Sequence, residues 1–576
     1  MFLVALAVGL GLALITFPVF DPDLWQHLRV GKLIWETRSI PDTQLWVWPT
    51  WSTPYMLPSW LFRVLLYPFW ALGGESGLLA WRWIMMLSAM GLTYGAARAL
   101  GGRGPWMLPA LLWCVMLYRF RSQARPETLA MVLMAVQIWL LEKRRAGGTV
   151  FGRDPAWAVV PIALVWANAH ISFTLGWLIT GIHLVASVWP GRSSVSAAPR
   201  TLGLVLLASL AASFLTPFGW RTVAEPFQFF FIWRHEPIYR VIGELQGIRW
   251  AGFSSALLPF WLVAVGGLFL WRWRTRGFDP VQALMLLAFA SQALGSQRFV
   301  ATMGVALTPY FARDLAEAMG TLRVPARARA LFDGAGVALV LAGLSLSASR
   351  ATDMRPGLGL RWSEYPVRAC DWIEAHEVRG KGFNSFDQAG YMLWRFWPDR
   401  GRLPFMDIHQ SGTKEDRALT AFALTDPPSW RRLDAARRFD YVLLPSRQMF
   451  GQRLLDVLDA DSTTWRLVFV DDAAALYLRR DGPFAALAER ERYRVLPAGD
   501  AAVARLAARP VSDTAFVAGL RRELERSVAE SPWTSVSHNM LAQLAQATGR
   551  PGEAERELRA ARDAAWKRPA DPKRAK

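Results

Sequence analysis

The sequence predicts a multi-pass α-helical membrane protein that ends in a polar part of mixed helices and strands. Hydrophobic residues make up 53% of the 576 residues, and charged residues make up 19%. The hydrophobic residues collect into runs before residue 350, and runs of ~20 residues match a hydrocarbon layer of ~30 Å. The loops between the runs are alternately rich and poor in basic residues, as in membrane proteins of fixed orientation.

About eleven apolar segments are predicted to span the membrane. They are residues 1–20, 77–97, 105–118, 128–141, 156–168, 172–189, 201–216, 253–271, 280–296, 298–312 and 331–349. The first segment has neither the basic start nor the small-residue cleavage site of a signal peptide, which favours a retained span.

Basic residues mark the loops on one side of the predicted spans. They are Arg98 and Arg103; Lys143, Arg144, Arg145 and Arg153; Arg192 and Arg200; Arg272, Arg274 and Arg276; and Arg313, Arg323, Arg327 and Arg329. The positive-inside rule places these loops and the N-terminus in the cytoplasm. Loops 21–76, 119–127 and 217–252 then face outward, as does everything after residue 350. The net charge of +19 reflects this orientation, and no nucleic acid is expected as a partner.

Three domains are predicted: a transmembrane domain (1–350), an outer α/β domain (351–482) and an α-helical segment with a basic tail (483–576). Residues 439–445 and 465–480 are rich in β-branched and aromatic residues, which is typical of strands. Cys114 and Cys370 have no obvious partner, so no disulfide or cysteine metal site is expected.

The last segment resembles one tetratricopeptide unit over residues 539–565, with small residues at Ala542 and Ala545 and a turn at Gly549. Because one unit cannot bury its own apolar face, residues 513–531 are expected to pack on it. Such a segment is a candidate surface for a protein partner.

Two aspartates and a histidine follow the first apolar run in "FPVFDPDLWQHLRVG". Asp21 is expected to cap a helix that has Pro22 in its first position. A cap alone does not account for His27, one helical turn from Asp23 on the same face. A carboxylate and an imidazole together favour acid/base chemistry or metal binding.

Further polar residues are predicted on the outer side. Asn168 and His170 end a span, where they are either functional or satisfied by the turn itself. Trp51 lies in "LWVWPTWSTPYMLPSW", which is typical of an interfacial aromatic belt or of a groove for a lipid chain. Several arginines lie where the positive-inside rule does not account for them, and they bind either a phosphate or lipid headgroups. They are Arg119, Arg121, Arg125, Arg221, Arg234, Arg240 and Arg298.

The segments "DPDLWQHLRVGKLIWETRSIPDTQLW", "RFRSQARPETLAMVL", "WANAHISFTLG", "LTPFGW" and "FNSFDQAGYMLWRFWP" together resemble bacterial GT-C-type integral membrane glycosyltransferases, over roughly residues 1–480. The sequence departs from the family pattern at Gln26, where an aromatic residue is common, and at Ile171, where glycine is common. These departures leave the lipid and acceptor specificity open.

The resemblance implies a GT-C-like fold in a bacterial cytoplasmic membrane and a sugar transferred from a polyprenyl-phosphate donor to an acceptor on the outer face. Asp21, Asp23 and His27 are then the catalytic candidates, because an attacking hydroxyl must lose its proton. The residues expected to bind the donor phosphate are Arg119, Arg125, Arg221 and Arg298. The residues expected in a donor or acceptor pocket are Trp51, Glu127, Asn168 and His170.

A transporter or flippase for a lipid-linked or anionic substrate is the alternative, with the arginines as its binding funnel. Transporters usually carry internal repeats and broken helices, and the sequence shows no such repeat. A non-catalytic assembly protein is the third reading, supported by the C-terminal segment. The sugar, the acceptor and any need for a divalent metal stay open.

Overall fold

The computed structural model describes residues 1–189, 199–240, 242–446, 452–564 and 567. The predicted basic tail lies outside the described residues apart from Lys567. The chain divides into two compact units. The helical unit comprises residues 1–19, 56–235 and 242–359, and the mixed unit comprises residues 20–55, 236–241 and 360–576.

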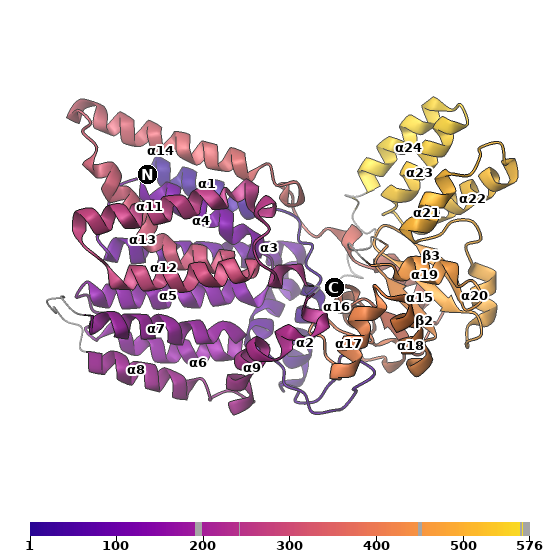
Figure 1. Cartoon of the computed structure of the whole chain (residues 1–576), viewed down its shortest axis with the longest axis horizontal. Helices are drawn as coiled ribbons and strands as arrows, with labels where there is room; N and C mark the ends of the chain where they lie inside the picture. Colours follow the sequence, from indigo (N-terminus) through magenta and orange to yellow (C-terminus); the bar gives the residue numbers. More distant parts are fainter. Residues whose placement is uncertain (190–198, 241, 447–451, 565–566, 568–576) are drawn as a thin grey trace. The chain divides into compact units, whose positions relative to one another are not determined.

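The helical unit is a bundle of helices (Figure 1). Its α-helices are α1 (Phe2–Ile15), α3 (Trp60–Ala99), α4 (Met107–Tyr118), α5 (Pro126–Arg145), α6 (Val159–Ala169), α7 (Thr174–Ser187), α8 (Pro199–Ala212), α9 (Trp220–Phe231), α11 (Leu258–Arg276), α12 (Pro280–Gly295), α13 (Val300–Thr321) and α14 (Ala326–Ala348). Its short 3-10 helices are η1 (Arg119–Arg121), η2 (Pro155–Ala158), η3 (Ile171–Phe173), η4 (Trp233–His235), η5 (Gly243–Leu245), η6 (Trp250–Ala256), η7 (Gln297–Phe299) and η8 (Thr352–Met354).

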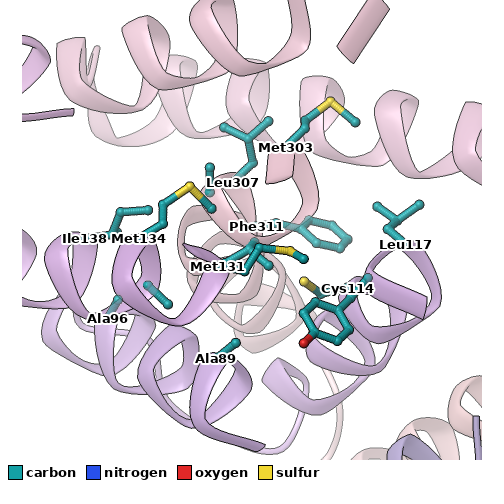
Figure 2. Close-up of a cluster of buried hydrophobic side chains, with 14 of the residues drawn as sticks. Ala89, Ala96, Cys114, Leu117, Met131, Met134, Ile138, Met303, Leu307 and Phe311 are labelled. Atoms are coloured by element: carbon teal, nitrogen blue, oxygen red, sulfur yellow. The ribbon is translucent and has the colours of Figure 1, made fainter. Parts of the chain in front are cut away.

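The core of the helical unit lies where α13 packs against α4 and α5 (Figure 2). The buried side chains drawn there include Met131, Met134 and Ile138 of α5, Met303, Leu307 and Phe311 of α13, and Cys114 and Leu117 of α4. On each helix they recur at intervals of three and four residues, which places them on one face. Gly304 allows the close approach, because a Cβ there would lie 3.2 Å from Leu117 Cδ1.

Each of the eleven predicted apolar segments falls largely within a helix of this unit. Among the described residues, α14 is the one helix long and apolar enough to cross a membrane unbroken, and η6 with α11 forms a second candidate bent by 72°. Several others are apolar but shorter than 18 residues, and α3 is interrupted at Gly74, where φ is 54°. The predicted number of spans is therefore not confirmed and stays a prediction.

The mixed unit contains a four-stranded sheet in the order β1-β2-β4-β3. The strands are β1 (Gly382–Asn384), β2 (Tyr441–Leu444), β3 (Trp465–Val470) and β4 (Ala475–Arg479). β1 pairs with β2 in parallel, and the other pairs are antiparallel. Residues 465–480 form a hairpin, and Asp471 closes its turn by accepting hydrogen bonds from the backbone N–H groups of Ala473 and Ala474, both at 2.9 Å.

Helices α15, α19 and α20 pack against this sheet, and further helices follow along the chain as far as Ala564 (Figure 1). The α-helices of the mixed unit are α2 (Leu24–Thr37), α10 (Pro237–Arg240), α15 (Val367–Ala375), α16 (Phe386–Phe396), α17 (Lys414–Ala423), α18 (Pro427–Arg437), α19 (Leu454–Ala460), α20 (Ala485–Glu491), α21 (Asp500–Ala507), α22 (Thr514–Glu530), α23 (Ser535–Ala547) and α24 (Pro551–Ala564), and its 3-10 helices are η9 (Trp362–Glu364) and η10 (Arg400–Arg402).

The predicted helical hairpin near the C-terminus is present as α23 and α24, which pack side by side (Figure 1). Gly549 forms the turn at a φ of 74°, and Ala542, Ala545 and Ala554 form a buried cluster between the helices. Helix α22 packs against α23, in the place expected for residues 513–531. The assignment to the tetratricopeptide family stays a prediction.

Candidate functional site

The two aspartates lie in a turn at the start of α2, in the mixed unit. Asp21 is fully buried, and its Oδ1 accepts a hydrogen bond from the backbone N–H of Asp23 at 3.1 Å. This bond closes a turn that precedes α2. The regular helix begins at Leu24 with Asp23 as its N-cap and without a side-chain cap bond, so the prediction of Asp21 as the N-cap and Pro22 as the first helical residue is wrong. We refer to residues 21–23 as the acid turn.

Aromatic residues of the mixed unit hold the acid turn in place. The Tyr365 hydroxyl donates to the backbone oxygen of Asp21 at 3.2 Å. The Trp25 ring lies 5.1 Å from that of Tyr391 and 5.6 Å from that of Tyr365, both edge-on. Trp25 is fully buried, so these contacts fix the first turn of α2 and with it the acid turn.

A close approach of α16, the helix that carries Tyr391, also fixes this turn. A Cβ on Gly390 would lie 2.5 Å from the backbone oxygen of Pro22 and 3.4 Å from the backbone nitrogen of Gln26. Since Pro22 stands between Asp21 and Asp23, the backbone that carries both carboxylates depends on a residue without a side chain at position 390.

A third carboxylate, Asp407, lies beside α2 and comes from a distant part of the chain. Gln26 Nε2 donates to Asp407 Oδ2 at 2.7 Å, and the backbone N–H of Ser411 donates to Asp407 Oδ1 at 2.8 Å. Asp407 is fully buried. The rings of His27 and His409 lie 6.0 Å apart. Gln26, which departs from the family pattern, thus anchors α2 to the loop that carries Asp407.

Three of the outer arginines and two glutamates form a cluster in the helical unit, which we call the arginine cluster. Arg121 forms ion pairs with Glu127 and, at 2.5 Å, with Glu244. Arg125 Nη1 lies 3.2 Å from Glu244 Oε2, and Arg298 Nη2 lies 3.1 Å from Glu127 Oε1. Each glutamate therefore bridges two arginines.

Short local signals position these side chains. Arg125 precedes Pro126 in the first position of α5, and Glu127 follows in the first turn, where the helix dipole favours a carboxylate. Arg298 lies in η7 between α12 and α13. Gln297 Nε2 donates to the backbone oxygen of Gly243 at 2.6 Å, which fastens the segment that carries Glu244.

The ion pairs keep the glutamates and arginines of this cluster in their charged forms. Burial by itself raises the pKa of Glu244, but Arg121 and Arg125 outweigh it and hold that pKa well below its usual range. Burial lowers the pKa of His170 to about 4 against the opposing effect of Glu127, so this imidazole is neutral at pH 7. Three positive and two negative charges leave the five side chains of the cluster with one net positive charge.

The other predicted site residues have different surroundings. Arg119 Nη1 donates to the backbone oxygen of Ala348 at 2.7 Å, and Nη2 donates to that of Met354. Arg221 is exposed at the start of α9. The structure therefore joins Arg125 and Arg298 in one cluster and leaves Arg119 and Arg221 outside it.

Asn168 and His170 are both engaged locally. Asn168 accepts a hydrogen bond from Trp60 Nε1 at 2.9 Å and donates to the backbone oxygen of Leu164 at 2.9 Å. His170 Nδ1 accepts from the backbone N–H of Ser172 at 3.2 Å. The bond of His170 lies within the turn, as in one predicted alternative, whereas Asn168 is also bound by Trp60, which is 108 positions away.

Trp51 is half-buried in the mixed unit, and the Arg400 guanidinium lies 4.5 Å from its ring centroid. This cation–π contact engages one face of the ring that was predicted to line a pocket.

The sequence did not predict Glu225, Asp407 or Glu244 as site residues. It also did not distinguish Arg121 from the other arginines of the loops predicted to face outward. Glu225 lines a cavity of about 10 Å³ with Ser59, Thr216 and Thr222, and burial raises its pKa to about 7 against the opposing effect of Arg63. The one available signal was charge, since Arg121 and Glu244 both lie in loops predicted to face outward.

No group of three or more His, Cys, Asp or Glu side chains among the described residues is arranged to hold a metal ion. A need for a divalent metal was left open by the sequence, and it stays open.

Comparisons with known proteins come from structure, since no family profile and no curated protein matches the sequence. ArnT from Cupriavidus metallidurans in the apo state aligns over 83% of this chain and 97% of its own, with 15% identity and a TM-score of 0.49. The same protein bound to undecaprenyl phosphate aligns over the same shares with a TM-score of 0.46.

Two other solved structures also align with this chain. The Archaeoglobus fulgidus oligosaccharyltransferase, in complex with Zn and sulfate, aligns over 77% of this chain and 68% of its own, with 13% identity and a TM-score of 0.47. Arabinofuranosyltransferase AftD from Mycobacteria aligns over 82% of this chain and 39% of its own, with 14% identity and a TM-score of 0.45.

These matches agree with the resemblance seen in the sequence. All identities are at most 15% and all TM-scores are below 0.5, so the matches indicate a likeness of fold alone. In that sense the chain is similar to GT-C-type enzymes.

Proposed function

We propose that this chain is a membrane glycosyltransferase that moves a sugar from a polyprenyl-phosphate donor to an acceptor on the outer face of the membrane. The observation that carries the proposal is the arginine cluster, in which Arg121, Arg125 and Arg298 lie together on two glutamates. A guanidinium binds phosphate oxygens through two parallel N–H groups, which suits a phosphate that gains charge during the reaction.

The acid turn supplies the second half of the proposed chemistry. An acceptor hydroxyl attacks the anomeric carbon, and a carboxylate of the turn takes its proton. The bond between the anomeric carbon and the phosphate oxygen breaks, and the phosphate leaves with one additional negative charge. Either Asp21 or Asp23 is the base in this scheme, and the other shapes the turn.

Substitution by asparagine separates these two roles. In Asp21→Asn, the amide oxygen can still accept the hydrogen bond from the backbone N–H of Asp23, so the turn is expected to survive. An amide cannot take the proton, and loss of a general base lowers the rate by ~10²–10⁴. We expect this loss in one of Asp21→Asn and Asp23→Asn, with donor binding little changed.

The assay follows release of polyprenyl phosphate by mass spectrometry in membranes that contain the protein, over a panel of hexose and pentose donors. Asp426→Asn is the matched control, because Asp426 caps α18 by accepting from the backbone N–H of Ser429 at 2.9 Å. Wild-type rates in both acid-turn variants would reduce the carboxylates to helix caps and remove the enzyme assignment.

A further inference from the structure

Glu244 occupies the position that an incoming anion would need in the arginine cluster. Its Oε2 lies 2.5 Å from Arg121 Nη1 and 3.2 Å from Arg125 Nη1. A carboxylate and a phosphate place their oxygens on a guanidinium in the same way, so a phosphate cannot bind both arginines fully while Glu244 does.

The two glutamates of the cluster differ in how easily their side chains can move away from the arginines. The Glu127 side chain is 17% exposed and belongs to the first turn of α5. The Glu244 side chain is 33% exposed and belongs to the short η5. Glu244 can therefore turn toward water at a lower cost than Glu127 can.

The backbone beneath Glu244 is held while its side chain is accessible. Ser296 Oγ donates to the Glu244 backbone oxygen at 3.1 Å, and the backbone N–H of Gln297 donates to the backbone oxygen of Gln246 at 2.8 Å. Both partners precede Arg298, so the segment is fastened beside the cluster. Rotation of one side chain is then enough to open the anion position.

The charge balance supports this exchange. Turning Glu244 away removes one negative charge from Arg121 and Arg125. The phosphodiester of the lipid-linked donor brings one negative charge in its place, and a phosphate monoester carries about two at pH 7. The monoester is the group that the proposed reaction releases.

We propose that Glu244 is a displaceable counter-ion that keeps the arginine cluster closed to weakly binding anions and yields to the phosphate of the polyprenyl donor. This inference rests on the proposed function and adds a specificity residue to it. Anionic phospholipids also carry phosphate, and they are a competing source of the same chemistry at a membrane surface. The carboxylate keeps them from occupying the arginines between turnovers.

The test uses the purified full chain in nanodiscs of phosphatidylcholine, with farnesyl phosphate as the probe. Glu244→Gln keeps the size of the side chain and removes its charge, and we expect it to bind farnesyl phosphate about tenfold more tightly than the wild type does. Replacing part of the phosphatidylcholine by phosphatidylglycerol is expected to weaken this binding in the variant several-fold more than in the wild type.

Glu317→Gln is the matched control, because Glu317 also bridges two arginines, Arg272 at 2.7 Å and Arg276 at 2.6 Å. Its affinity for farnesyl phosphate is expected to equal that of the wild type. If Glu244→Gln does not fold, Glu244→Asp replaces it, since a side chain one methylene shorter holds the arginines less well and gives a smaller gain.

Turnover supplies a second readout that a purely structural role would not change. In Glu244→Gln, the KM for the lipid-linked donor is expected to fall, and inhibition by the released polyprenyl phosphate is expected to become stronger. Unchanged or weaker binding of farnesyl phosphate by both Glu244 variants would overturn the inference.

Two further results distinguish failure of the proposed function from failure of the inference about Glu244. If wild-type binding of farnesyl phosphate is lost in Arg298→Ala but is not improved in Glu244→Gln, the phosphate site stands and the inference about Glu244 fails. If neither the wild type nor any variant binds the probe, the proposed function fails together with the inference.

Discussion

Substitution of Gly390 by alanine tests whether the acid turn depends on the close approach of α16. The added Cβ would lie 2.5 Å from the backbone oxygen of Pro22, whereas carbon and oxygen atoms in close contact lie ~3.3–3.6 Å apart. The two backbones must therefore separate by ~0.8 Å or more. Because the contact atom belongs to the backbone, no side-chain rotation relieves the clash.

This displacement has two consequences of different size. Overpacking of this kind costs ~1–3 kcal/mol of stability, so the mixed unit is expected to unfold at a lower temperature. Asp21 and Asp23 flank Pro22 and move with it, and a catalytic group misplaced by ~1 Å can lose ~10² in rate. We expect Gly390→Ala to lower the rate of sugar transfer by ~10–10² and to leave farnesyl phosphate binding unchanged.

The assay compares release of polyprenyl phosphate, probe binding and thermal unfolding in the same preparations. Gly552→Ala is the matched control, because Gly552 also lies in a helix of the mixed unit and a Cβ there would meet nothing within 4 Å. A Gly390→Ala variant with wild-type rate and stability would refute the reasoning, since it would show that α16 can move without shifting the acid turn.

Two further predictions concern stability. Burial raises the pKa of Asp471 to about 7, against the hydrogen bond from Ser531, so its contribution to stability is full below the unfolded pKa of 3.8 and is lost as the pH rises through 7. Relative to Asp471→Asn, the wild type is therefore expected to lose melting temperature between pH 5 and pH 8, and parallel pH profiles would contradict this. Arg119→Ala is expected to cost about 1–3 kcal/mol, because it leaves the backbone oxygens of Ala348 and Met354 without their donor. Its affinity for farnesyl phosphate is expected to be unchanged, and a large loss of affinity would return Arg119 to the phosphate site.

Local patterns were the part of the structure that could be predicted from the sequence. The Asp-Pro pair predicted a helix that starts near residue 22, and α2 begins at Leu24. The apolar runs predicted helices, and the small residues around Gly549 predicted the hairpin of α23 and α24. In each case, the residues that form the pattern and the element that they predict lie within ~15 residues of each other in the chain. Rules of periodicity and capping therefore apply directly.

Pairings between distant residues could not be predicted in the same way. Arg121 and Glu244 are 123 positions apart, and Gln26 and Asp407 are 381 positions apart. Neither pair leaves a periodic signal, because tertiary packing brings the partners together. For the same reason Arg119 and Arg121 looked alike in sequence, although one binds backbone oxygens and the other binds two carboxylates.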